Sequence, residues 1–237
     1  MRLIIGVVLL LVAGALGALD VSMLAPTHSV LLKKYSVPLK KKIRDGIMTL
    51  FDGNVSVSVS NDNVENGSFK IHSDNFSVTL TGKYAITSRN LDFAVFATPP
   101  TDGNKWIVIG SSLFGATGYS ANIEVLTVIL FPLSGENPRI FQLSSFFGSI
   151  NNFFLLPHQQ GNRVGFICVK LYRVGGVDNY VCNWFMFNRN GLINTTSLEN
   201  LIVLQDSPNG IKKIHEVPED IKENFKLRYP DVLDDDD

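Results

Sequence analysis

The sequence has few of the residues, and none of the short motifs, by which enzyme active sites are usually recognised. Its 237 residues include only 2 Cys and 4 His. The histidines form no HxH, HxxxH or HExxH pair that would indicate a zinc site: His28, His72, His158 and His215. A GxSxG nucleophile elbow, a Walker A loop and a GxGxxG turn are also missing. We therefore expect a protein that is not an enzyme and that has no catalytic residue, cofactor or metal site.

A strong charge of one sign is lacking as well. The chain has 21 Lys and Arg against 22 Asp and Glu, which gives a formal net charge of −1. No overall field therefore attracts nucleic acid. Hydrophobic residues make up 45% of the chain and aromatic residues 10%, a composition that excludes disorder throughout. The chain is also long enough to bury one sizeable core.

Long hydrophobic runs are missing except at the N-terminus. A basic second residue is followed by the apolar run 3–12 and then by small residues, which is the pattern of a secretory signal peptide with cleavage after Ala15 or Ala18. The run is short for a transmembrane helix, which needs about 20 apolar residues, and an uncleaved anchor is the alternative. We predict a secreted, extracellular protein with no transmembrane segment after signal removal. Its predicted parts are a signal peptide at 1–18, a single mainly-β domain at 19–230 and an acidic disordered tail at 231–237.

Four N-glycosylation sequons support export: Asn54-Val-Ser, Asn66-Gly-Ser, Asn75-Phe-Ser and Asn194-Thr-Thr. In the alternating pattern of the strands beside them, Asn54 and Asn75 fall on the polar positions. Glycans there would therefore lie on the solvent-exposed face of the sheet. Together with the signal peptide, these sites predict a secreted glycoprotein.

The most informative stretch is 164–187. Two runs rich in β-branched and aromatic residues flank Gly175 and Gly176, which indicates a β-hairpin whose turn needs φ > 0. Folding the arms about Gly175 places Cys168 directly opposite Cys182, at a Cα separation that a disulfide spans. In an oxidising compartment we predict a disulfide between these cysteines. A pair of free thiols is the alternative.

Residues 38–51 have the pattern of an N-terminal amphipathic helix. The apolar positions recur at helical spacing: Leu39, Ile43, Ile47, Leu50 and Phe51. Basic residues occupy the other side: Lys40, Lys41, Lys42 and Arg44. Pro38 suits a first turn and Gly53 a helix end, whereas Gly46 weakens the prediction. We interpret the basic side as a solvated face, and binding to a membrane surface or a polyanion is the alternative.

Alternation with a period of two dominates much of the remaining chain. In 55–60, 69–72 and 75–81 apolar residues alternate with polar ones, which is typical of an antiparallel sheet with one wet face. About ten short strands are expected in all, followed by a short C-terminal helix at 217–230. The predicted fold is mainly β: an antiparallel β-sandwich or partly closed barrel, with the two helices at its ends.

Carboxylate pairs serve glycosidases, and five acidic residues are candidates: Asp45, Asp92, Asp102, Glu124 and Asp178. Sequence spacing brings no two of them together. Glu124 is the most unusual because it lies in the apolar run 123–131. Burial there would raise its pKa and let it act as an acid, but we favour a surface position at the start of the strand. Lys170 and Arg173 in the hairpin can lay their stems on apolar surface with the charge in water.

These observations favour a secreted glycoprotein that acts as a non-catalytic binding or interaction module. A carrier of a hydrophobic ligand is one form of it, since the Phe-rich stretch 141–154 could line an apolar interior, although a packed core explains the same residues. One alternative is a matrix or mineral-associated structural protein, suggested by the acidic residues at 234–237, whose hard oxygens suit calcium. The other is a secreted hydrolase with no recognisable motif. The expected partner is an extracellular protein, a lipid or the matrix.

Overall fold

The computed structural model describes residues 20–53, 55–60, 68–73, 76–81, 91–100, 104–112, 123–131, 138–157, 162–187, 192–195, 201–205, 212–214 and 216–228. The predicted signal peptide, the predicted acidic tail and the sequons at Asn54, Asn66 and Asn75 lie outside the described residues, whereas Asn194 ends a strand. Within those residues, no helix has the length and apolar character needed to cross a membrane.

The strands form three antiparallel sheets, which we name A, B and C. Sheet A contains β1 (Val30–Leu31), β12 (Phe153–Leu156), β13 (Arg163–Val174), β14 (Val177–Phe187), β15 (Leu192–Asn194), β16 (Ile202–Gln205) and β17 (Lys212–Ile214). Sheet B contains β11 (Arg139–Phe146), β10 (Ile123–Phe131), β9 (Lys105–Ser112), β8 (Leu91–Ala97) and β2 (Ser36–Pro38). Sheet C contains β3 (Lys40–Arg44), β4 (Ile47–Asp52), β5 (Val55–Ser60), β6 (Ser68–Ser73) and β7 (Phe76–Thr81). The described chain is thus mainly β and antiparallel, as predicted.

Short helices complete the fold: the 3-10 helices η1 (Val21–Leu24), η2 (Leu32–Tyr35) and η4 (Ile150–Asn152), and the α-helix α1 (Glu219–Arg228). The helix α1 confirms the C-terminal helix predicted at 217–230. Pro218 precedes it, and acidic residues occupy its first turn. Their negative charges interact favourably with the positive end of the helix dipole. Its residue Ile221 is fully buried against Tyr172 and Val181 of sheet A.

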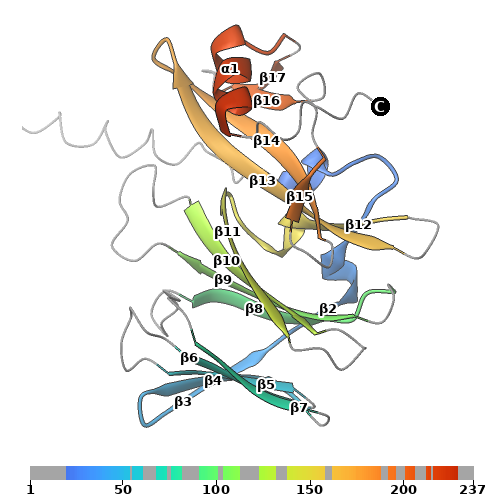
Figure 1. The fold of residues 1–237 in the computed structure, drawn as a ribbon, viewed down its shortest axis with the longest axis vertical. Coiled ribbons are helices and arrows are strands. Elements are labelled where there is room, and N and C mark those ends of the chain that lie inside the picture. Colours follow the sequence, from blue (N-terminus) through green and yellow to red (C-terminus); the bar gives the residue numbers. More distant parts are fainter. Residues whose placement is uncertain are drawn as a thin grey trace, which may run out of the picture.

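The sheets are stacked with B in the middle (Figure 1). One hydrophobic cluster joins the facing sides of sheets A and B, with Val108, Leu126 and Phe166 among its buried members. A second joins the other side of sheet B to sheet C through residues such as Ile109 and Met48. Both faces of β9 and β10 are therefore buried, which explains why their sequences are almost continuously apolar instead of alternating.

The hairpin β13–β14 corrects the predicted pairing of the cysteines. Its turn consists of two residues, Gly175 and Gly176, with φ of 57° and 79°, so the register pairs Cys168 with Asn183 and Val169 with Cys182. A turn centred on Gly175 alone, as predicted from the sequence, differs from this register by one residue. A slip of one residue moves a side chain to the other face of a sheet.

The two cysteines consequently lie on opposite faces of sheet A. Cys168 belongs to the cluster shared with sheet B, whereas Cys182 belongs to a cluster that includes Leu24 of η1. Both are buried free thiols, so the predicted disulfide is absent from the structure.

The free thiols lead to a direct chemical prediction. After unfolding without a reducing agent, both cysteines should react with iodoacetamide, whereas the native protein should react little. Burial removes the thiols from solvent and raises the pKa of both, that of Cys168 to about 11, and the thiolate is the reactive form. Mass spectrometry counts the labels. A peptide cross-linked through Cys168 and Cys182 would contradict the observed register.

The N-terminal amphipathic helix predicted at 38–51 is also corrected, because the structure has the hairpin β3–β4 there. Asp45 and Gly46 form its turn with φ of 50° and 76°, the positive values of a type I′ turn, for which Asp-Gly is a preferred sequence. Gly46 therefore marks a turn, not a weak point in a helix. Met48 and Leu50 point into the core from β4, and the helical spacing of the apolar residues is incidental.

Candidate functional site

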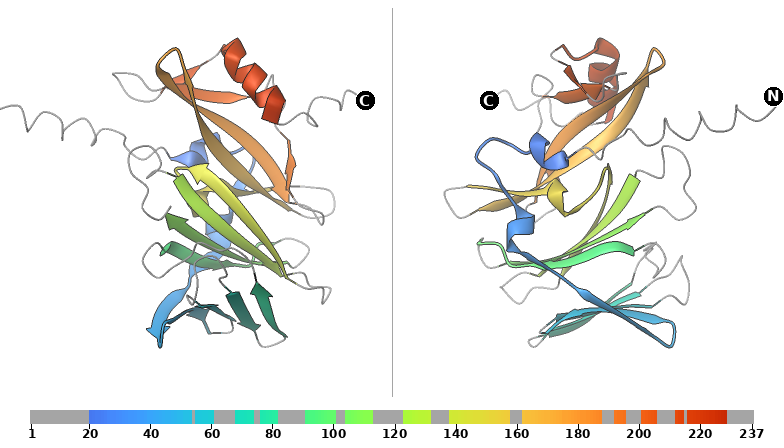
Figure 2. Two further views of the ribbon diagram at one scale, coloured as in Figure 1. Left: turned by 60° about the vertical axis from the view of Figure 1, so that its left-hand side comes forward. Right: turned by 180° about the vertical axis from the view of Figure 1, so that it is seen from behind.

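The outer side of sheet C concentrates positive charge. Met48, Leu50 and Val57 face sheet B, so the alternate positions of β3 to β6 face outward. The outward positions include five exposed basic or imidazole side chains, which define the basic face: Lys40, Lys42, Arg44, Lys70 and His72. Sheet C is one of the two outer layers of the stack (Figures 1 and 2), and no described element lies over this side.

Acidic residues are missing from the basic face. No Asp or Glu occupies any position of β3 to β7 whose register places it on the outer side. The nearest acid in sequence, Asp45, lies in the β3–β4 turn and forms an exposed ion pair of 3.4 Å with Arg44. A chain whose net charge is close to zero thus presents a locally positive field here, and that field attracts anions.

Hydroxyl groups separate the basic side chains. The register aligns Lys42, Thr49, Ser58 and Lys70 in one row across four strands. Within this row the Thr49 Oγ1 and Ser58 Oγ atoms lie 3.2 Å apart, at hydrogen-bond distance. Such a row offers charge for attraction and small polar groups for hydrogen bonding.

A second candidate site is a carboxyl pair at one end of sheet B. Strand β8 has a bulge between Leu91 and Phe93, and the intervening Asp92 forms a side-chain hydrogen bond with Glu124 of β10. Glu124 is half-buried between Ser112 and Ser145 of the neighbouring strands. Of the five acidic candidates, the structure brings these two together.

Burial is the main cause of the unusual pKa of Glu124. Desolvation raises it from 4.5 to about 8, and the charge and hydrogen bond of Asp92 add to the effect. The Oε1 atom of Glu124 is buried and has no hydrogen-bond partner in the described part of the chain. A Cβ atom at Gly148 would overlap the Glu124 side chain, so the absence of a side chain at Gly148 leaves the space that Glu124 occupies. The position that the sequence favours for Glu124, at the start of a strand, is what the structure shows, but the side chain there is half-buried and not fully on the surface.

The geometry of the carboxyl pair differs from that of a glycosidase. Catalytic carboxyls in those enzymes stand about 5–9.5 Å apart, with the substrate between them, whereas Asp92 is near enough to Glu124 to raise its pKa through charge and hydrogen bonding. Among the described residues, no group of three His, Cys, Asp or Glu side chains could hold a metal ion.

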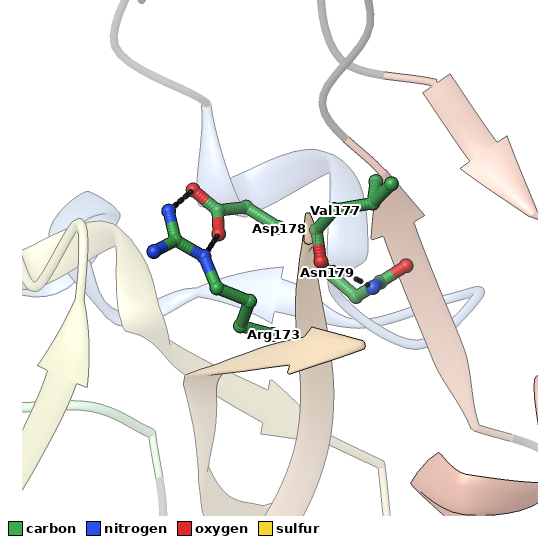
Figure 3. A network of polar contacts seen from close by, with 4 residues as sticks. All are labelled: Arg173, Val177, Asp178 and Asn179. Carbon is green, nitrogen blue, oxygen red and sulfur yellow. Dashed lines mark hydrogen bonds and ion pairs between the residues drawn. The ribbon is translucent and has the colours of Figure 1, made fainter. Parts of the chain in front are cut away.

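The other predicted candidates are dispersed. Asp178 is nearly buried and accepts a 2.8 Å bond from Arg173 Nε across the β13–β14 turn (Figure 3). Lys170 Nζ donates to Ser144 Oγ at 3.0 Å. His28 is exposed near the N-terminal end of the described chain. Asp102, His158 and His215 lie outside the described residues.

The sequence reasoning missed one buried polar network. Strand β12 pairs with β13 only as far as Phe166. Beyond that residue, two side chains form hydrogen bonds with the backbone of β13. Asn152 Nδ2 donates to Ile167 O at 2.7 Å, and Val169 N donates to Ser145 Oγ at 2.9 Å. Asn152 Nδ2 also donates to Ser145 Oγ at 3.2 Å. Since these groups satisfy the open edge of β13, we regard the network as structural. The Ser149-x-x-Asn152 spacing, which resembles a capping box, was the only signal of it.

Comparison with protein-family models, with curated proteins and with solved structures found no match to this chain.

Proposed function

We propose that this protein is a secreted glycoprotein that acts as a non-catalytic binding module, and that it holds an extended anionic surface on the basic face of sheet C. The sequence places Asn54 and Asn75 on the same side of their strands as this face, so the proposal requires these two sequons to carry no glycan. The observation that carries the proposal is the segregation of charge. Five basic or imidazole side chains share a face on which no register position holds an acid, in a chain whose net charge is −1.

The structure behind this face suits a binding role. The inner side of sheet C packs on sheet B through fully buried residues such as Met48, Leu50 and Val57. A packed core holds the outer side chains on a rigid scaffold, so that little order has to be gained on binding. The clusters on either side of sheet B also have fully buried centres, which supports a filled, sandwich-like core more than a lipid-filled chamber.

The proposal predicts that reversing charge on the basic face weakens binding to a polyanion. The double variant Lys40→Glu/Lys42→Glu should leave a heparin column at a clearly lower salt concentration than the unchanged protein, because fewer cations hold the polyanion. Both side chains are exposed on an edge strand, so folding should be preserved, which circular dichroism checks.

A matched control separates the face from net charge. Lys33→Glu/Lys34→Glu makes the same charge change at exposed residues of η2, outside sheet C, and should alter retention only slightly. Equal losses in the two variants would show that net charge alone governs binding. An unchanged protein that passes through the column at low salt would contradict the proposal.

A further inference from the structure

The tip of the β3–β4 hairpin combines exposed apolar and basic side chains. Ile43 is 53% exposed and Ile47 is 45% exposed, and both flank the Asp45–Gly46 turn. Ile43 pairs with Met48, whereas Ile47 pairs with Arg44. These pairs face opposite sides of the hairpin, so apolar surface is available on both faces of the tip.

Two features of the fold leave these isoleucines uncovered. Strand β3 is the edge of sheet C, and all five of its residues are exposed, although Met48 beside it is fully buried. The turn also forms an outer corner of the molecule in the views of Figures 1 and 2. An apolar pair at a projecting turn is unusual, because a solvent-exposed turn is ordinarily polar.

We infer that the anionic surface held by the basic face is a lipid bilayer, into which the β3–β4 turn inserts Ile43 and Ile47. The inference rests on the proposed function and names its partner. Basic residues near the tip match anionic headgroups: Lys40, Lys41, Lys42 and Arg44. Lysine stems can extend along the apolar boundary while their charged ends stay at the headgroups.

The isoleucines distinguish a bilayer from a sulfated polysaccharide. Both partners would use the cations and hydroxyls of the basic face, since both present dense negative charge. Only a bilayer provides an apolar phase in which Ile43 and Ile47 leave water. The pair therefore favours the bilayer.

The test uses vesicles of phosphatidylcholine with and without phosphatidylserine, followed by co-sedimentation. The unchanged protein should bind only the vesicles that contain phosphatidylserine. Ile43→Ser/Ile47→Ser should reduce that binding about tenfold, since two largely exposed isoleucines lose their transfer into the apolar phase, while heparin retention stays unchanged. The matched control is Val177→Ser, at a residue that is 39% exposed beside the turn of β13–β14, and it should bind vesicles as the unchanged protein does.

A fluorescent reporter tests insertion directly. In Ile47→Trp, the emission of the new indole should shift to shorter wavelength when phosphatidylserine vesicles are added, because the ring enters a less polar phase. Vesicle binding that survives Ile43→Ser/Ile47→Ser, or an unshifted emission in the bound state, would overturn insertion and leave the proposed function intact. Heparin retention without vesicle binding would identify a polysaccharide as the partner. Failure to bind either probe would overturn the proposed function as well.

Discussion

Replacing Glu124 with Gln is expected to stabilise the protein near neutral and mildly alkaline pH, and to change little at about pH 4. The folded protein holds a proton on Glu124 up to about pH 8, whereas an unfolded chain releases it near 4.5. The contribution of Glu124 to the free energy of unfolding is therefore fully present below pH 4.5, and it decreases as the pH rises from 4.5 to about 8. Above about pH 8 the loss is complete. An amide cannot ionise, so Glu124→Gln removes this dependence.

The size of the effect follows from the same linkage. A full shift between these two pKa values would be large, but Glu124 is half exposed, and solvent screening reduces its contribution. We expect a gain of about 2 kcal/mol at about pH 8, which corresponds to roughly 4–8 °C in the thermal midpoint of a chain of this size. Thermal unfolding at a series of pH values measures both the gain and its window.

Two further carboxylate variants separate the causes of the shift. Asp92→Asn removes the neighbouring charge but leaves the burial of Glu124, the larger cause, so it should reduce the pH dependence without abolishing it. Asp45→Asn alters an exposed turn residue with φ of 50°, a conformation that Asn tolerates, and should leave the profile unchanged. Parallel profiles for Glu124→Gln and the unchanged protein would refute the buried carboxyl.

The carboxyl pair shows how far the sequence could predict a site. Glu124 was recognisable as unusual because it interrupts the apolar run 123–131. Its partner was not, since Asp92 reaches it through a bulge in β8. A bulge depends on the register between two strands, and one sequence does not fix that register.

The hairpins show the same limit in the fold. Alternating strands such as β5 were predictable because one side is buried and the other is wet. Strand β3 was not, because all five of its residues are exposed and it carries no alternation. In β13–β14 both strands were predicted, but the two-residue turn at Gly175 and Gly176 shifted their register by one position. That single step places Cys168 and Cys182 on opposite faces of sheet A. No local sequence pattern predicts this placement.

The basic face was anticipated only in composition. The sequence shows the cations at 40–44 and allows a membrane surface or a polyanion as their partner, but its spacing predicts them on a helix. As a strand, the same residues divide between two sides of sheet C, and Lys40, Lys42 and Arg44 join Lys70 of β6. This grouping depends on the pairing of four strands, so residues nearly thirty positions apart in the sequence share one face.

Replacing Asn152 with Ala is expected to destabilise the protein by about 3 kcal/mol, in the upper range for a single substitution. Asn152 is fully buried and joins three elements. Its amide donates to Ile167 O of β13 and to Ser145 Oγ of β11, and its Oδ1 atom accepts from Ser149 N at 2.8 Å. Alanine would leave these partners buried without their bonds, and unpaired buried polar groups carry a large desolvation cost. Urea unfolding measures the loss.

The adjacent asparagine provides a matched control of the same type. Asn151 has a buried Oδ1 atom with no hydrogen-bond partner in the described structure, so Asn151→Ala removes an unsatisfied acceptor and should be neutral or slightly stabilising. Asn152→Asp adds a further test, because a carboxylate can still accept from Ser149 N but cannot donate to Ile167 O. It should destabilise at least as much as alanine does.

Hydrogen exchange locates the damage within the network. Ser145 Oγ accepts from Val169 N and donates to Phe146 O at 2.9 Å, so Ser145→Ala should speed exchange of the Val169 amide, whereas Asn152→Ala leaves that bond in place. Because the network joins sheets A and B, neither change reaches the basic face of sheet C, and both variants should keep their heparin retention while folded. If Asn152→Ala unfolds at the same urea concentration as the unchanged protein, other groups must satisfy the edge of β13. If the folded variants lose heparin retention, the network between sheets A and B must be coupled to sheet C.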